Sequence, residues 1–287
     1  MAIEKQIWID QIKEEFTPDT SFLSASDDLS ELVEHNKINL AAAGVDPEVL
    51  IDNTTYPVAT KSREDVPIEV LLHTLDTENT VVRNIEEMES SYKKMESVIR
   101  GHRRSLQSKA AMFAANAWAP QSHTTMTPVL QTTGIADDTK RKRMTFADLL
   151  SLERAFRNMN APLDRLVLVL SPDHLCDLQL ENMTLYRAAM DTKRVGAFQL
   201  FSYADLPYYN TADKAKLALG AATDDTSAQA SIAYVKTEVV RAVGNVDMFL
   251  NEKSVTERGD VVGFQMRFTA MPYQSKYIAS IYSNREA

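Results

Sequence analysis

A long run of apolar residues with helical spacing, beginning at Val81, is the feature that most restricts the possible folds. The apolar positions follow one another in steps of 4, 3, 4, 3 and 4 residues, which places them on one face of an α-helix. They are Val81, Ile85, Met88, Tyr92, Met95 and Ile99, with Leu106, Ala110 and Phe113 continuing the stripe. Because Pro120 ends the pattern, we predict a helix over residues 81–118, which is long for a globular protein. Gly101 lies near its middle and weakens it by up to about 1 kcal/mol.

The stretch before this helix, "TYPVATKSREDVPIEVLLHTLD" at residues 55–76, predicts a β-hairpin. Two runs with strand character flank a charged tip that contains Lys61, Arg63, Glu64 and Asp65. Each arm carries a proline, Pro57 or Pro67, and proline is confined to the edges of sheets. Val66, Ile68 and Val70 alternate along the second arm and form its apolar face. A lone two-stranded ribbon is marginally stable in water, so the hairpin needs a surface to lie against.

The rest of the chain alternates between helix and strand patterns without a regular βαβ order. A second helix is predicted from Thr145, with Asp148 completing a variant of the capping box. Its apolar face consists of Leu149, Leu152, Phe156 and Met159. The run "RLVLVL" at 165–170 is typical of a strand buried on both faces, and Ser171 and Pro172 then begin another helix. Further strands are predicted in "AFQLFSYADLP", "SIAYVKTEVVRAV", "VVGFQMRFTAM" and "KYIASIY", so the fold class is α+β.

Composition excludes several classes of protein. The 287 residues include one cysteine, Cys176, so no disulfide forms within the chain, and a reducing cytosol fits best. We expect no signal peptide at the N-terminus and no membrane span, because no apolar run is long enough. The net charge of −9 argues against a protein that coats nucleic acid, although it allows one that encloses nucleic acid without gripping it.

No catalytic or cofactor motif stands out, so we predict no enzyme activity, no cofactor and no metal. Phosphate-binding glycine loops, HExxH, CxxC and GxSxG motifs are absent from the sequence. His174 and Cys176 are two residues apart, but no further ligand completes a metal shell, and we favour a helix residue beside a small buried thiol. The basic run 140–143 suits either a nucleic-acid backbone or, as we favour, a solvated loop or partner contact. The acid pairs Asp27–Asp28, Asp137–Asp138 and Asp224–Asp225 are expected in solvated loops.

The order of predicted elements resembles the major capsid protein of tailed bacteriophages, with the HK-97-like fold. The resemblance covers roughly residues 35–283 and includes "AGVDPEVLIDNTTYPVATKSREDVPIEV" and "DTENTVVRNIEEMESSYKKMESVIRGHRRSL". These are similar to capsid proteins of phages that infect Bacteroidetes-type hosts. "MTFADLLSLERAFRNMNAPLDRLVLVLSPDHLCDL" and "VGAFQLFSYADLPYY" resemble the entry to the axial domain and the strand that follows it.

The resemblance implies a division of the chain into five parts. They are an N-terminal arm (1–50), an extended hairpin loop (51–80), a peripheral domain with the spine helix (81–161), an axial domain (162–245) and C-terminal strands of the peripheral domain (246–287).

The resemblance also implies a function in which hexamers and pentamers form an icosahedral shell around double-stranded DNA. We expect self-assembly in the host cytoplasm, a location in the virion capsid, a separate scaffolding protein, a portal and decoration proteins, without sequence-specific DNA binding or membrane contact. The hairpin would then lie on a neighbouring subunit, where the mixed charges of Lys61, Arg63, Glu64 and Asp65 set the register and Val66, Ile68 and Val70 supply apolar contact. The lysine–asparagine crosslink of some family members cannot be matched to residues here.

Three alternatives remain open from the sequence. An encapsulin-type compartment shares the fold but encloses enzymes, and its cargo separates it from a phage shell. A cytosolic α+β enzyme would show a convergent polar pocket. A decoration or portal-associated protein is the third, although the long helix behind a hairpin favours the shell itself.

Overall fold

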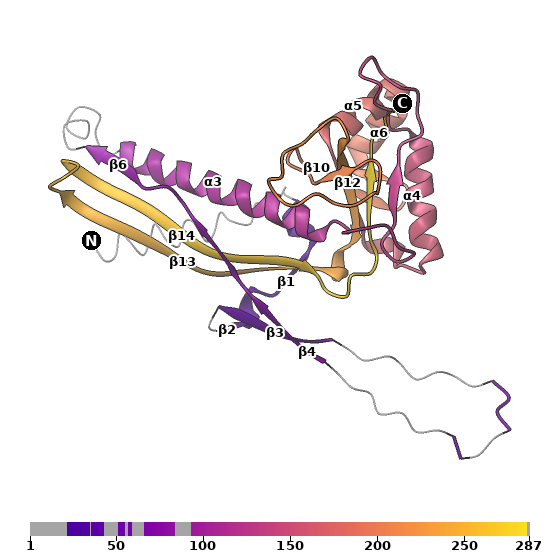
Figure 1. Ribbon diagram of the computed structural model, residues 1–287, viewed down its shortest axis with the longest axis horizontal. Coiled ribbons are helices and arrows are strands. Elements are labelled where there is room, and N and C mark those ends of the chain that lie inside the picture. The colour runs from indigo at the N-terminus through magenta and orange to yellow at the C-terminus, as the bar shows by residue number, and fades with distance from the viewer. Residues whose placement is uncertain are drawn as a thin grey trace.

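A long arm, a compact domain and a small projecting sheet make up the part of the chain that the structure describes (Figure 1). The computed structural model describes residues 22–34, 36–42, 51–54, 57–58, 66–83 and 93–285. Helices and strands are mixed within each larger part, so the predicted α+β class is confirmed. Within these residues no helix is both long and apolar enough to cross a membrane.

The long arm is built on an antiparallel hairpin of two long strands, β13 (Val239–Ser254) and β14 (Gly259–Pro272). β1 (Asp27–Asp28) pairs with β13, whereas β5 (His73–Asp76) and β6 (Thr80–Arg83) pair with β14. Helix α3 (Lys93–Trp118) lies along this sheet (Figure 1). The strand predicted at "VVGFQMRFTAM" is confirmed as part of β14, and four of its alternate side chains are buried. They are Phe264, Met266, Phe268 and Ala270, in one core with Ile99, Leu106 and Ala110 of α3.

The start of the predicted long helix was wrong, although its C-terminal part is confirmed. Val81 and Val82 lie in β6, where they pair with Val261 and Asp260 of β14. Ile85, Met88 and Tyr92 lie outside the described residues. β-Branched residues favour strands, and the neighbouring backbone of β14 supplies hydrogen-bond partners that helical spacing alone does not reveal.

The compact domain contains a seven-stranded sheet in the order β7-β15-β12-β8-β10-β9, with β11 also paired to β12. The strands are β7 (Val129–Gln131), β8 (Leu166–Leu170), β9 (Arg194–Val195), β10 (Phe198–Ser202), β11 (Tyr208–Asn210), β12 (Ser227–Val235) and β15 (Ile278–Tyr282). All five residues of β8 are buried, as predicted. The helices of the compact domain are α4 (Phe146–Asn158), α5 (Pro172–Glu181) and α6 (Met183–Thr192). Along the whole described chain, short 3-10 turns occur at Phe22–Ala25, Ser30–Leu32, Leu163–Arg165 and Lys236–Glu238.

The predicted helix starts in the compact domain are confirmed at the level of hydrogen bonds. Thr145 accepts a bond from the Asp148 backbone, and the Asp148 carboxylate accepts one from the Thr145 backbone, which completes the capping box. Ser171 caps α5 by accepting from the His174 backbone, with Pro172 in the first turn. The predicted apolar face of α4 is buried in the second core cluster; it consists of Leu149, Leu152, Phe156 and Met159.

The projecting sheet contains β2 (Val33–Glu34), β3 (Lys37–Ala42) and β4 (Val66–Leu71). The predicted hairpin therefore needs correction, because β4 pairs with β3 rather than with the run just before the charged tip. The connection between these strands spans residues 43–65. Ile38 and Leu72 pack against Ala242 of β13 and fix the sheet to the long arm. Gly244 allows this close approach, since a Cβ there would lie 2.8 Å from the Leu72 side chain.

Between residues 93 and 285 the chain passes three times between the long arm and the compact domain, the first time from α3 to β7. It leaves the compact sheet through the turn at Lys236–Glu238 between β12 and β13, and it returns after β14 to form β15. The predicted boundary at residue 245 falls inside β13. The two parts are consequently joined by continuous strands as well as by packing.

Replacing Gly101 by alanine should stabilise the protein. Gly101 is an exposed helical residue, and a Cβ there would meet no atom within 4 Å. Because alanine loses less backbone entropy than glycine in a helix, we expect the free energy of unfolding to rise by about 0.5–1 kcal/mol. Urea unfolding followed by circular dichroism measures this, and an unchanged or lower value would contradict an ordered α3 at this position.

Candidate assembly surfaces

The residues predicted to contact a neighbouring subunit fall on the projecting sheet and its loop. Lys61, Arg63, Glu64 and Asp65 lie outside the described residues. The other three, Val66, Ile68 and Val70, lie in β4 opposite Ala42, Leu40 and Ile38 of β3. The apolar positions of β4 are thus opposite apolar positions of β3.

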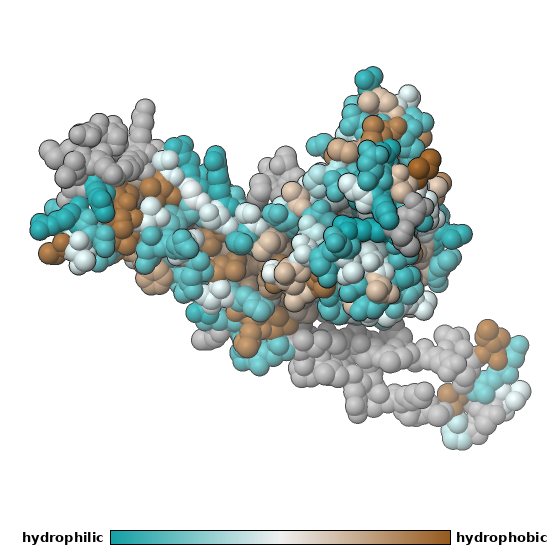
Figure 2. Space-filling model, turned by 45° about the horizontal axis from the view of Figure 1, so that its top comes forward, coloured by the Kyte–Doolittle hydropathy of each residue, from teal (hydrophilic) through white to brown (hydrophobic). Residues whose placement is uncertain are grey.

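The base of the projecting sheet rests on its own subunit. Ile38 is buried and Val70 is half-buried, but Leu71 is 69% exposed. Lys37 of β3 forms an ion pair with Glu69 of β4. Ile51, which lies between β3 and β4 in the sequence, is 86% exposed. Hydrophobic patches also interrupt the polar surface of the long arm in Figure 2.

A groove lies between α3 and β5 on the long arm. Its volume is about 850 Å³, and its apolar side chains are Leu75, Val98, Leu106, Met112, Phe113 and Leu219. Asp76 and Glu78 lie at its strand side and Lys109 at its helix side. Gly101 and Ser105 add little bulk to the helical wall, so the groove stays open.

His102 is the unusual polar residue of this groove. Only 7% of its surface is exposed, and its ring lies 5.3 Å from that of Phe264. Its Nε2 atom is buried without a hydrogen-bond partner. Burial lowers the pKa of His102, which keeps the ring neutral near pH 7. The sequence offered no direct signal for this groove, except that small or polar residues recur at 101, 105 and 109 on one face of the helix.

A half-buried lysine, Lys216, ties the compact domain to the end of α3. Lys216 Nζ donates to the carbonyl oxygens of Asn116 and Ala119 at 2.7 and 2.9 Å. These carbonyls lie at the C-terminal end of the helix, where the helix dipole favours a positive charge. The last turn of α3 has no basic residue of its own. Burial lowers the pKa of Lys216 to about 8. Trp118 adds a second tie, because its Nε1 donates to the Val240 carbonyl at 3.2 Å.

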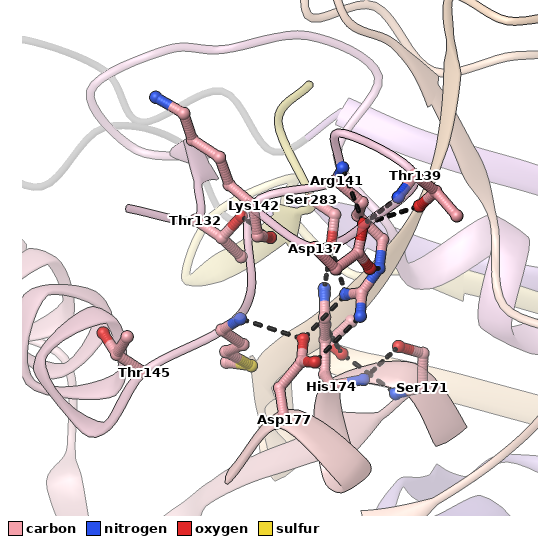
Figure 3. Close-up of polar contacts among 12 residues, drawn as sticks. Thr132, Asp137, Thr139, Arg141, Lys142, Thr145, Ser171, His174, Asp177 and Ser283 are labelled. Carbon is pink, nitrogen blue, oxygen red and sulfur yellow. Dashed lines mark hydrogen bonds and ion pairs between the residues drawn. The ribbon is translucent and has the colours of Figure 1, made fainter. Parts of the chain in front are cut away.

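A polar network in the compact domain joins the basic run to α5 (Figure 3). Arg141 donates from both terminal nitrogens to the Asp177 carboxylate, at 2.7 and 2.8 Å. Asp177 also accepts from the Met144 backbone at 2.9 Å. Arg141 further donates to Ser283 Oγ at 3.1 Å and to Asp137 at 3.2 Å. Arg141 is therefore held by carboxylates, which corrects the interpretation of the whole basic run as a solvated loop.

His174 continues the network into the core. Its Nδ1 lies 2.7 Å from Ser231 Oγ, and its Nε2 lies 2.9 Å from Ser283 Oγ. Burial lowers the pKa of His174 to about 4, so the ring is neutral, with one nitrogen donating and the other accepting. A serine beside a histidine resembles a catalytic pair, but Ser231 is fully buried and Ser283 nearly so. The adjoining hollow is only about 150 Å³. The network holds β12, α5 and the segment after β15 together. Its role is therefore structural.

Two further expectations about polar residues changed with the structure. Cys176 is exposed rather than buried, and among the described residues no group of three His, Cys, Asp or Glu could hold a metal ion. One member of each acid pair is bound to its surroundings: Asp28 pairs with Arg241, Asp137 with Arg141, and Asp224 accepts from Ser227. Asp28 and Asp224 are nevertheless exposed, as expected, whereas Asp137 is half-buried beside Arg141.

The buried His174 should make stability depend on pH. The folded pKa of about 4 lies below the ordinary value of 6.5, so the unfolded chain takes up a proton as the pH falls through this window, and the folded chain does not. We expect wild type to lose up to about 3 kcal/mol of unfolding free energy between pH 6.5 and pH 4 relative to His174→Gln. Urea unfolding of both proteins across this range gives the difference, and equal slopes would show that His174 is not buried as a neutral ring.

Comparison with solved structures finds the same fold over nearly the whole chain. A chain of Mycobacterium phage Che8 has a TM-score of 0.63 at 13% identity, covering 93% of this chain and 92% of its own. The capsid of Ralstonia phage GP4 gives a TM-score of 0.65 at 11% identity, with coverages of 93% and 89%. A virus-like particle from Pyrococcus furiosus gives 0.60 at 11% identity, with coverages of 97% and 99%.

Sequence comparisons add no closer relative. No protein-family model matches the chain, and no curated protein does so. At identities of 11–13% the structural likeness establishes the fold. The chain therefore has the α+β fold of the HK-97-like phage capsid structures.

Proposed function

We propose that this protein is a structural major capsid protein, many copies of which assemble into a closed icosahedral shell. The observation that carries the proposal is the likeness to several phage capsids across 93% of the chain, with most of each matched chain covered as well. A likeness of this extent includes the long arm and the compact domain together. The projecting sheet and the exposed Leu71 and Ile51 support it, because they offer contact surface to a neighbouring copy.

The finer parts of the proposal follow the family resemblance. The subunits form hexamers and pentamers, the shell encloses double-stranded DNA, and assembly occurs in the host cytoplasm with a separate scaffolding protein, a portal and decoration proteins. The host is of Bacteroidetes type. Net charge of −9 supports an inner wall that does not hold DNA tightly, which would let the genome enter and leave.

The division of the chain into peripheral and axial domains belongs to the same proposal. The long arm takes the place of the peripheral domain and the compact domain that of the axial domain. In this arrangement Lys216 and Trp118 hold the angle between the two domains. The loop between β3 and β4 lies on a neighbouring subunit, with Lys61, Arg63, Glu64 and Asp65 at the contact and Val66, Ile68 and Val70 along its second strand.

A compartment of the encapsulin type is the second candidate. It is favoured by the likeness to the virus-like particle from Pyrococcus furiosus, which covers 97% of this chain. Both candidates predict closed shells, and they differ in the contents. A cytosolic enzyme is less favoured, because the polar network around His174 is sealed in the core.

Purified protein should form closed shells or flat tiles of hexamers and pentamers. We would separate assemblies on a sizing column and view them by electron microscopy, with and without phage lysate as a source of scaffold. Nuclease-protected DNA inside the shells would support the capsid, whereas protein cargo would support the compartment. A stable monomer or small oligomer under every condition would overturn the shell-forming role.

Reversing the charges at the loop tip should impair assembly. We expect the double change Arg63→Glu and Glu64→Arg to slow shell formation several-fold at low salt, because opposite charges across an interface steer association. The same exchange at the exposed neighbours Asp164 and Arg165 keeps net charge constant and serves as the control. Light scattering follows the rate. Equal rates for wild type and both variants would argue against a contact at the tip.

A further inference from the structure

We propose that the exposed face of α3 is the surface of the subunit that contacts the phosphate backbone of double-stranded DNA. The inference rests on the proposed shell function, and it names the part of the inner wall against which the enclosed DNA lies. Three features of the helix carry it: the sign of its charge, the composition of its exposed face, and two basic side chains that are available to a ligand.

The first feature is the charge of α3 relative to the rest of the chain. The helix contains six lysines and arginines and one acidic residue, so its formal charge is +5, whereas the whole chain has a net charge of −9. Among the other described helices, α4 and α6 are neutral, and α5 has three acidic residues and no lysine or arginine. Positive charge is thus gathered on one element of an acidic subunit, which favours contact between that element and a polyanion.

The second feature is the composition of the exposed face. Positions 97, 101, 104 and 108 follow one another at the spacing of one helical face, and positions 100 and 105 lie beside them. None of these six positions holds an apolar side chain larger than glycine. A partner helix would need apolar anchors on this face, whereas a phosphate backbone is bound by charged side chains and hydroxyl groups. The six exposed residues, named here the basic strip, are Ser97, Arg100, Gly101, Arg104, Ser105 and Ser108.

The third feature is that two basic side chains are available to a ligand. Arg104 is exposed in the basic strip, and Lys109 is exposed about one helical turn beyond Ser105. Within the described residues, neither Arg104 nor Lys109 forms an ion pair. Arg100 and Arg103 take part in other interactions. The phosphate contact is therefore assigned to Arg104 and Lys109.

The dimensions of this face suit a duplex. α3 lies along one side of the long arm (Figure 1). At a rise of about 1.5 Å per residue, residues 97–109 extend about 18 Å along the helix axis. B-DNA presents one phosphate charge per about 1.7 Å of its own axis, so a duplex beside the basic strip brings several phosphates within reach of Arg104 and Lys109. The serine hydroxyls of the strip add neutral hydrogen-bond donors.

The acidic remainder of the subunit keeps this contact weak. DNA is attracted along α3 and repelled by the surplus of acidic residues elsewhere, so one subunit holds it loosely. Many copies in a shell add their contributions together. Such a contact depends on salt and carries no sequence preference, which agrees with a genome that enters and leaves the shell.

Arg104→Gln combined with Lys109→Gln tests the contact. Fluorescence anisotropy of a labelled duplex of about 30 base pairs measures its affinity for unassembled full-length protein between about 50 and 200 mM salt. We expect the double variant to bind about tenfold more weakly than wild type at the lowest salt. We also expect the slope of log affinity against log salt to become shallower by about 2, because two phosphate contacts are lost.

Arg154→Gln combined with Arg187→Gln is the matched control. These arginines are exposed on α4 and α6, and their replacement removes the same amount of charge. We expect this control to bind the duplex as wild type does. Arg104→Lys combined with Lys109→Arg keeps the charge in place and should also retain binding. Circular dichroism checks that each variant is folded, and poly-L-glutamate serves as a second probe that we expect to bind less tightly than the duplex.

The outcomes separate this inference from the proposed function. Loss of duplex binding in Arg104→Gln with Lys109→Gln, with binding kept in the control, supports the contact. Equal losses in both variants, or no duplex binding by wild type at the lowest salt, overturn α3 as the DNA surface. Poly-L-glutamate that binds as tightly as the duplex overturns DNA as the occupant in favour of an acidic polypeptide. Electron microscopy scores shells separately, so wild type that binds the duplex through α3 but forms no shells overturns the proposed function alone.

Discussion

The packing of α3 on the β13–β14 hairpin is the interaction on which the rest of the structure depends. A two-stranded ribbon of this length is not stable alone, and neither is a single helix in water. Together they bury Phe264, Met266 and Phe268 against Ile99 and Leu106. Toward the C-terminal end of α3 the contacts are made by Ala110, Ala114 and Ala115, all fully buried, which let the helix approach the sheet closely. At the end of α3, Trp118 packs into the same core, and its ring contacts the rings of Phe22 and Tyr234.

The other described parts of the subunit are each attached to this helix and hairpin by specific contacts. The N-terminal segment is attached by Phe22 on Trp118 and by β1 on β13. The projecting sheet is attached by Ile38 and Leu72 on Ala242. The compact domain is attached by Lys216 on the helix end. Lys216 is more informative than a surface ion pair would be, because it is half-buried and its ammonium group donates to two backbone carbonyls at the end of the helix.

Much of the fold could be predicted from the sequence, and the failures share one physical cause. Local rules were sufficient for α4, where the Thr145–Asp148 capping box and the apolar spacing agree, and for β8, where five apolar residues in a row mark a buried strand. They failed at Val81 and Val82, which continue a helical spacing but pair with β14, 178 or more residues away in the chain. They failed again for the hairpin, because the partner of β4 is β3 and lies across a long loop. Spacing along the chain describes a face, whereas the partner of that face is decided by tertiary contacts.

The assembly surfaces show the same division. The alternation of Val66, Ile68 and Val70 was visible in the sequence, as was the polarity of the tip. The groove was not, because it forms between β5 and α3, and its floor includes Leu219 from the compact domain. The meaning of Arg141 was also hidden, since Asp177 lies 36 residues further along the chain. In both cases the sequence shows which residue types are present, but it does not show which of them come together in the fold.

An isolated subunit carries several features that oppose its own stability or solubility. His102 has a buried nitrogen without a partner, and such an atom costs about 1–3 kcal/mol. The edge of β5 invites pairing with other chains, and Ile51 and Leu71 expose apolar surface. In a monomeric enzyme these features would be selected against, because they promote aggregation without any gain. In the proposed shell, contacts between copies would bury this apolar surface and pair these polar groups, which would offset the cost within each copy.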